Sequence, residues 1–215
     1  MLDPAGLIAP FCDSTGGYLP LLCVMNATGV LHEVARLFPR EDLETLTRAA
    51  ERVQPGCEGL VFLPFLQGER VPDLPLATGS LLGLRPGLLQ PGHLFRAALE
   101  GVSLNLAWGV ERMRALGLAI EELRLVGGGA RNALWAQILA DVLGARVRRL
   151  AENESAALGA ALQAAWIVCR GSLDALVQGQ VALLQDAILP QPESVACYRQ
   201  AQSRFQDAVR RLHGA

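Results

Sequence analysis

Residues 123–144, LRLVGGGARNALWAQILADVLG, form the stretch of sequence that decides the fold. Alternating apolar residues run into three consecutive glycines and an amphipathic segment follows, which predicts a strand at 123–126, a tight turn and a helix at 132–143. Glycine permits positive φ and close approach of a ligand, and the first N–H groups of a helix are unpaired at the positive end of its dipole. The stretch therefore predicts a turn that can hold a phosphate or a nucleotide.

The glycine turn matches neither of two common nucleotide-binding motifs. No lysine follows it as GxxxxGK[ST] requires, and the spacing GxGxxG with a later acidic residue is lacking. A triple glycine is also often only a structural turn. The remaining interpretation is a strand–turn–helix unit whose backbone N–H groups can bind an adenosine or its α-phosphate. In this interpretation Asn132 is placed to hydrogen-bond a base or ribose.

Composition indicates a globular chain and argues against several classes of protein. The chain has 215 residues, of which 51% are hydrophobic and 19% charged, so it can bury a substantial core. The net charge of -2 argues against a nucleic-acid binder, and the apolar run at 156–169 is too short to cross a membrane. We expect a cytoplasmic protein without a leader sequence, and the apolar composition is compatible with a homodimer or with a face buried against another domain.

The five cysteines fall at irregular spacing without a CxxC pair. This argues against a metal site and against a disulfide framework. We expect most of these cysteines to be small buried hydrophobic residues.

Hydrophobic periodicity predicts the remaining elements. They are a hairpin within residues 6–25, helices at 28–37, 41–53, 91–117, 154–169 and 191–213, and strands at 60–65 and 146–150. Residues 75–92 are rich in Gly, Pro and Leu and are predicted to be irregular. The helix at 91–117 is expected to be core scaffold, with Glu100 and Trp108 off its apolar stripe.

Two further segments carry candidate functional residues. The loop with Gly68, Glu69 and Arg70 follows a strand expected to be buried, where α/β folds tend to place ligand-facing residues; the alternative is a pair of solvated charges. The helix that begins at Glu154 contains small residues such as Gly159, which would let a neighbouring backbone pack closely. Such a crossing would serve either as a hinge between domains or only as tight packing.

Four motifs follow one another along the chain. They are FLPFLQGERVP (62–72), RAALEGV (96–102), GGGARN with ADVLG (127–132 and 140–144) and ESAALGAA (154–161). In this order they closely resemble the C-terminal domain of the FGGY carbohydrate kinases, over nearly the whole chain. The resemblance implies an α/β, actin-like or ribonuclease-H-like ATPase domain spanning residues 1–215, with a mixed sheet flanked by helices. It also implies ATP-dependent phosphorylation of a ketopentose such as xylulose to its 5-phosphate.

The resemblance assigns roles to two groups of residues. The family's adenosine motif is matched by Gly127, Gly128, Gly129 and Asn132. The interdomain cleft and hinge are matched by Gly68, Glu69, Arg70, Glu154 and Gly159. Thr78 departs from the family, because relatives often carry a basic residue there, and no charged contact is expected at this point.

The resemblance also implies parts that lie outside these residues. Relatives have an N-terminal domain that carries a Gly-rich phosphate turn, most sugar contacts and the aspartate that acts as general base, and a second phosphate loop precedes the match. We therefore expect no catalytic residue and no metal site in this chain, with Mg²⁺ held mainly by the absent domain and the isolated fragment inactive. Conceivable substitutes for the base are Asp13, Asp73 and Asp141.

The expected partners are ATP or ADP, and a sugar reached through the missing domain. The alternative function is a non-catalytic nucleotide-binding or assembly module derived from a sugar kinase.

Overall fold

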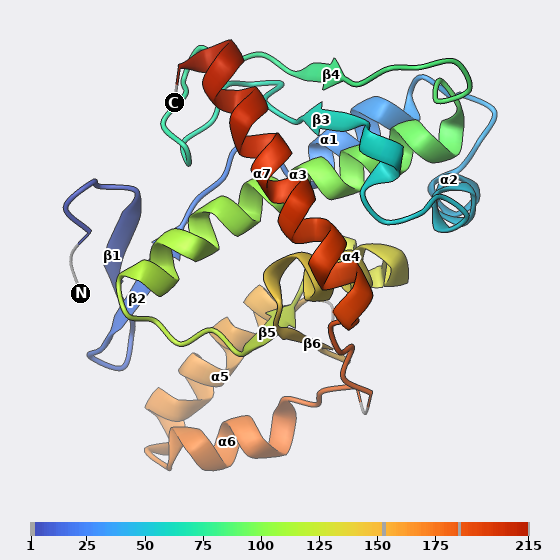
Figure 1. The fold of residues 1–215 in the computed structure, drawn as a ribbon. Helices are drawn as coiled ribbons and strands as arrows, with labels where there is room; N and C mark the ends of the chain where they lie inside the picture. The colour runs from blue at the N-terminus through green and yellow to red at the C-terminus, as the bar shows by residue number, and fades with distance from the viewer. Residues whose placement is uncertain (1–2, 152–153, 185, 215) are drawn as a thin grey trace.

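A computed structural model describes residues 3–151, 154–184 and 186–214 (Figure 1). Its strands are β1 (Ile8–Cys12), β2 (Tyr18–Leu22), β3 (Val61–Leu63), β4 (Ser80–Leu82), β5 (Glu122–Leu125) and β6 (Arg146–Arg149). Its helices are α1 (Thr28–Ala35), α2 (Leu43–Glu51), α3 (Pro91–Ala115), α4 (Ala133–Leu143), α5 (Ser155–Cys169), α6 (Leu173–Gln180) and α7 (Pro192–His213). Short 3₁₀ turns lie at η1 (Cys57–Gly59) and η2 (Gly128–Arg131).

The strands form both kinds of ladder. β1 pairs with β2 and β3 with β4, both antiparallel, whereas β5 and β6 are parallel. The expected mixture of ladder types is therefore present. Among the described residues, however, the strands form three separate pairs and not one continuous sheet.

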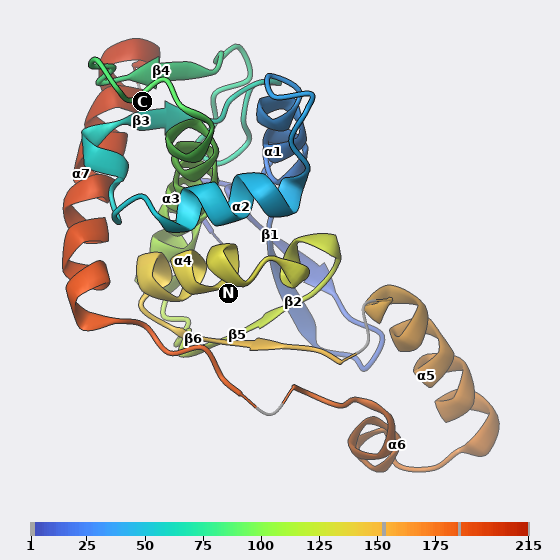
Figure 2. The ribbon, with the colours of Figure 1, turned by 90° about the vertical axis from the view of Figure 1, so that its right-hand side faces the viewer.

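The long helix α3 is the centre of the molecule (Figures 1 and 2). Most of its predicted apolar stripe is buried, including Phe95, Leu99 and Val102, whereas Leu106 and Met113 at its later turns are partly exposed. Other helices cover so much of α3 that Glu100, which lies off this stripe, is only 3% exposed. Its carboxylate accepts hydrogen bonds from Arg96 Nε at 2.7 Å and from the Tyr198 hydroxyl at 2.9 Å, which supply the polar partners that a buried charge needs.

Most predicted elements are present within a few residues of their predicted bounds, with two exceptions. The prediction that 75–92 is irregular is wrong at Ser80–Leu82, which pair with β3. Helix α6 was not predicted; it begins after Ser172, whose hydroxyl accepts from the Ala175 N–H. The pairing of β4 with β3 is a tertiary contact that the local sequence encodes weakly, whereas the cap of α6 is a local contact.

The expectation that most cysteines are buried is wrong. Cys57 is buried, Cys12 and Cys169 are exposed, and Cys23 and Cys197 are intermediate. No helix in the described part of the chain is long and apolar enough to cross a membrane.

Candidate nucleotide site

The glycine turn differs in detail from its prediction. Gly127 follows β5 with φ +79° and ψ −174°, and the 3₁₀ turn η2 then separates it from α4. Asn132 is the N-cap of α4, because its Oδ1 accepts the Trp135 N–H at 2.9 Å. One of the unpaired donors at this helix end is therefore satisfied by the chain itself.

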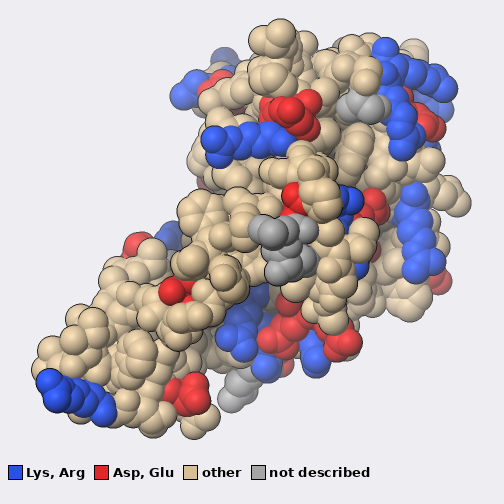
Figure 3. Space-filling view, turned by 90° about the vertical axis from the view of Figure 1, so that its left-hand side faces the viewer, with Lys and Arg blue, Asp and Glu red and all other residues tan. Residues whose placement is uncertain are grey.

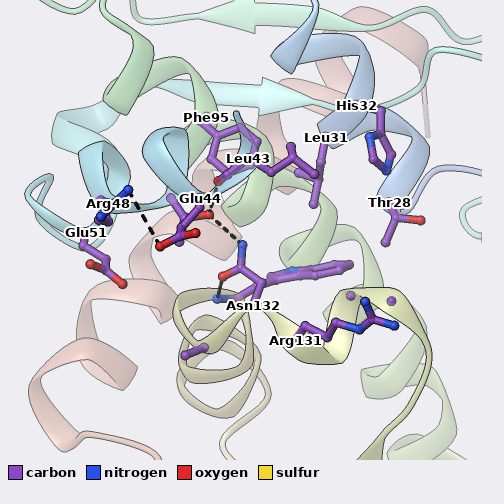
Figure 4. Close-up of a pocket in the computed structure, with 15 residues that line it drawn as sticks. Thr28, Leu31, His32, Leu43, Glu44, Arg48, Glu51, Phe95, Arg131 and Asn132 are labelled. Atoms are coloured by element: carbon purple, nitrogen blue, oxygen red, sulfur yellow. Dashed lines mark hydrogen bonds and ion pairs between the residues drawn. The ribbon is translucent and has the colours of Figure 1, made fainter. Parts of the chain in front are cut away.

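A cavity of about 650 Å³ lies between this turn, α1, α2 and the start of α3 (Figure 4). Its large apolar side chains are those of Leu31, Leu43, Phe95 and Trp135. Its polar side chains are those of Thr28, His32, Glu44, Thr47, Arg48, Glu51, Arg131 and Asn132. An apolar cavity with polar groups around it is the usual form of a small-molecule site.

Trp135 forms a fixed wall of this cavity. Its indole Nε1 donates to Ser103 Oγ at 3.0 Å, and the Ser103 hydroxyl donates in turn to the Leu99 carbonyl at 2.8 Å. The side chain is 5% exposed, and a Cβ on Gly129 would collide with its ring. A Cβ on Gly128 would meet no atom within 4 Å. Gly129 is thus required for packing, whereas Gly128 leaves open space at the cavity.

The predicted nucleotide-binding residues are only partly brought together. Gly128, Gly129 and Asn132 line the cavity, and Gly127 is not among its lining residues. Asn132 Nδ2 also donates to Thr47 Oγ1 at 3.0 Å, so this side chain joins α4 to α2. Its carbonyl and amide each retain capacity for one further hydrogen bond, which leaves room for contact with a base or ribose.

Glu69 is a buried anchor of its loop, and the alternative of a solvated charge is wrong for it. The side chain is 2% exposed, and its carboxylate accepts the N–H groups of Met25 at 2.7 Å and Arg70 at 2.8 Å. It also accepts from the side-chain amides of Asn26 at 3.1 Å and Asn105 at 3.0 Å. Four donors therefore hold this carboxylate and connect the loop to α3 and to the chain after β2.

The neighbours of Glu69 have different roles. Gly68 has φ +67°, and a Cβ there would overlap the Pro75 carbonyl, so the tight loop needs glycine. Arg70 is exposed, with Nη1 at 3.6 Å from Cys23 Sγ. Together with Asp73 it lines a second cavity of about 310 Å³, separate from the one at the glycine turn.

The predicted hinge residues Glu154 and Gly159 lie at and in α5, away from both cavities. Close packing is not seen at Gly159, because a Cβ there would meet no described atom within 4 Å. Figure 2 shows α5 and α6 projecting from the body of the molecule. Any close partner of α5 at this glycine must therefore come from outside the described residues.

Of the three aspartates that could replace the general base, Asp13 and Asp141 have structural partners, and Asp73 lines the second cavity, separate from the one at the glycine turn. Asp13 Oδ1 accepts from the N–H groups of Thr15 and Gly17, both at 2.8 Å, inside the hairpin turn. Asp141 accepts the Gln191 N–H at 2.7 Å, which joins α4 to the start of α7. No cluster of three potential metal ligands occurs among the described residues.

Comparison with known proteins identifies close relatives. Residues 12–168 match the profile of the FGGY family of carbohydrate kinases, C-terminal domain. A xylulose kinase of Haemophilus influenzae is 36% identical over 99% of this chain, and a gluconokinase of Bacillus licheniformis is 32% identical over 84%. The crystal structure of a xylulose kinase from Rhodospirillum rubrum, 31% identical, superposes on 99% of this chain with a TM-score of 0.85.

The chain spans less than half the length of these proteins. It covers 43% of the Haemophilus kinase, 35% of the gluconokinase and 43% of the Rhodospirillum chain.

Proposed function

This chain belongs to the FGGY family of carbohydrate kinases, and from that premise we propose that it is the nucleotide-binding C-terminal half of an ATP-dependent ketopentose kinase. Its predicted fold class, an actin-like α/β ATPase domain, is confirmed by the solved structures of family members. Membership of this family supports phosphoryl transfer to a carbohydrate as the reaction class.

The cavity at the glycine turn carries the proposal. Its volume of about 650 Å³ lies within the usual range for ligand pockets, and flat apolar walls such as Trp135 suit a purine ring. The open space at Gly128 allows a nucleotide to approach the backbone of the turn. In this proposal the adenosine occupies the cavity, and Asn132 uses its remaining hydrogen-bonding capacity on the base or ribose.

The identity of the sugar is proposed from the relatives, and the location of its binding site from which residues this half contains. Xylulose kinases lead the similar curated proteins, with a gluconokinase somewhat further away, which favours a ketopentose such as xylulose. Two carboxylates, Glu44 and Glu51, line the nucleotide cavity, and the described residues hold no group of three potential metal ligands. We assign the sugar, the general base and most metal contacts to the polypeptide that completes the kinase in its relatives.

Calorimetric titration of the chain with ADP tests nucleotide binding. Gly128→Val places its Cβ in open space at the cavity, where its side chain would obstruct a bound nucleotide, so it should weaken ADP binding by about tenfold or more, or about 1.4 kcal/mol. Gly179→Val is the matched control, because a Cβ there also meets no atom and α6 is remote from the cavity. Loss of affinity in both variants, or in neither, would contradict the proposed site.

An enzyme assay distinguishes a kinase half from a non-catalytic module. The chain with ATP, Mg²⁺ and xylulose should give no turnover, and the N-terminal half of a related xylulose kinase should restore phosphorylation. Turnover by the chain alone would refute the assignment of the general base and the sugar site to the other half of the kinase. ADP binding with no turnover after addition of the missing half would favour the non-catalytic alternative.

A further inference from the structure

Residues 56–59 form a left-handed turn between α2 and β3. Their φ values, from Gly56 to Gly59, are +80°, +47°, +51° and +88°, although Cys57 and Glu58 are not glycine. Left-handed backbone is costly for residues with a Cβ and persists only where the surrounding structure imposes it. Strain of this kind is concentrated at binding and reactive sites. The neighbours of this turn are therefore candidates for a binding site.

Buried contacts fix the turn against helix α7. The Gly56 N–H donates to Glu100 Oε1 at 3.1 Å, and the Tyr198 hydroxyl of α7 donates to the same oxygen at 2.9 Å. Cys197 Sγ, also on α7, donates to the Pro55 carbonyl at 3.1 Å. Figure 2 shows the turn beside α7. The turn and this helix are therefore held in a fixed arrangement by the chain itself.

Two guanidinium groups meet at the turn from different elements. A Cβ added to Gly59 would lie 3.8 Å from Arg85 Nη2, in the loop after β4, and 3.9 Å from Arg204 Nη1 of α7. A Cβ added to Gly56 would lie 3.6 Å from Arg204 Nη2, so this guanidinium reaches both glycines. Arg85 Nη2 also donates to the Glu58 carbonyl, which holds its side chain at the turn. Both arginines are exposed to solvent.

The two arginines have no acidic partner. In the described part of the chain, Arg204 makes no hydrogen bond or ion pair, and Arg85 is bonded only to the Glu58 carbonyl. The Glu58 carboxylate lies 3.2 Å from His93 Nε2 instead. A single exposed arginine is simply hydrated, but two guanidinium groups at one turn repel each other, and a bound anion removes that repulsion.

The arrangement favours a small tetrahedral anion. One guanidinium satisfies both oxygens of a planar carboxylate, whereas the terminal oxygens of a phosphate can contact two guanidinium groups that arrive from different directions. Figure 3 shows the basic side chains of one face in separate groups, divided by neutral and acidic residues. Such a face lacks the continuous basic track that a polyanion such as nucleic acid requires.

We propose that Arg85, Arg204 and the turn at residues 56–59 form an oxyanion site that binds a phosphate group, either as free phosphate or as the phosphomonoester of a small metabolite. None of these residues lines the nucleotide cavity, so the oxyanion site is a separate one. Because the buried Glu100 carboxylate already fixes the turn and α7, binding requires only that the two exposed arginine side chains become ordered.

Amide NMR spectra of the full chain, titrated with inorganic phosphate at constant ionic strength, locate the site directly. The signals of Gly56, Glu58 and Gly59 should shift and saturate at low millimolar phosphate, whereas that of Gly179 in α6 should not move. Shifts that rise linearly without saturation, or that sodium chloride reproduces at the same ionic strength, would overturn the proposal. Saturable shifts confined to residues 127–129 would assign phosphate to the nucleotide cavity and would also overturn it.

A pair of charge-matched variants tests the role of Arg204. Arg204→Gln should weaken phosphate binding by about fivefold or more, because it removes one of the two guanidinium groups. Arg199→Gln is the control, because it removes the same charge from another exposed position of α7 and should leave the affinity within about twofold. Circular dichroism establishes that both variants are folded. Equal weakening in the two variants, or none in either, would contradict the oxyanion site.

Two further titrations identify the source of the phosphate group. Ribose 5-phosphate carries a phosphomonoester, and ribose is the neutral control. Shifts at the turn with ribose 5-phosphate and with phosphate, but not with ribose, would support a site for phosphorylated metabolites. Shifts with inorganic phosphate alone would support a site for the free ion. Equal shifts with ribose and ribose 5-phosphate would overturn the proposal, because the arginines could not then be the groups that bind.

Discussion

Two neighbouring glycines should respond very differently to the same added methyl group. Gly129→Ala places its methyl against the ring of Trp135 and 3.2 Å from Thr28 Cγ2. Trp135 cannot move away easily, because its indole N–H is bonded to Ser103 and its side chain is 5% exposed. Gly128→Ala places its methyl in open space, with no atom within 4 Å. Neither glycine has positive φ, so only the available space distinguishes the two substitutions.

The expected magnitudes follow from this difference. Overpacking a buried site costs about 1–3 kcal/mol, and a domain of this size loses about 2–4 °C in Tm per kcal/mol, so Gly129→Ala should lower Tm by about 2–12 °C. Gly128→Ala should leave Tm unchanged or raise it slightly, because alanine restricts the unfolded chain. Differential scanning calorimetry of both variants, followed by ADP titration, provides the measurement. Equal losses of Tm in the two variants would refute the assignment of Gly129 to packing and Gly128 to the cavity.

Three further predictions concern buried or bonded polar groups. Glu69→Gln turns an amide N–H₂ toward the donors that the carboxylate accepts, so the free energy of unfolding in urea should fall by about 1–3 kcal/mol; an unchanged value would contradict the four-donor arrangement. Tyr198→Phe removes a hydroxyl bonded to the buried Glu100 carboxylate at 2.9 Å and should cost about 1.5–3 kcal/mol by the same assay, whereas a loss below about 0.5 kcal/mol would show that the bond contributes little. The hydrogen bond from Arg112 lowers the pKa of Asp3 from 3.8 to about 2. The Asp3 carboxylate therefore stabilises the folded state above pH 3.8, and this stabilisation is lost as pH falls through about 2. Asp3→Asn should therefore reduce the loss of Tm between those pH values, and an identical pH profile would contradict this linkage.

Local patterns predicted the elements well because their signals lie within short segments. Residues 123–144 carry apolar alternation, glycines and helical periodicity in sequence, and the structure has β5, the turn and α4 there. Strand β4 was missed because its pairing with β3 is tertiary, and Gly and Pro around it indicate a loop. Glu69 was open to a solvated interpretation because its amide donors, Asn26 and Asn105, lie 43 and 36 residues away.

Asn132 shows why a candidate site is harder to predict than a helix. Sequence reasoning assigned its side chain to a ligand, yet an asparagine immediately before an amphipathic segment is also the standard N-cap signal, and the structure has it capping α4. Asn132 can cap α4 and also contact a ligand only because its side-chain carbonyl and amide each keep one hydrogen bond free after the cap and the bond to Thr47.

The cap also bears on how a bound nucleotide would be oriented. The sequence suggested that the first N–H groups of α4 hold a phosphate, but the Trp135 N–H is already bonded to Asn132 Oδ1, and η2 separates the glycines from the helix. The cavity instead offers apolar walls for a base, with Arg131 and Arg48 as its cationic side chains. In the proposed kinase this half therefore contributes mainly to binding the nucleoside, and charge neutralisation of the transferred phosphate falls to the metal and the other half. If this half binds mainly the nucleoside, removal of Mg²⁺ should change the affinity of the isolated chain for ADP by less than about threefold. Calorimetry with and without EDTA measures this change. A larger loss would show that this half itself holds the metal–phosphate group, and the division of labour would have to be redrawn.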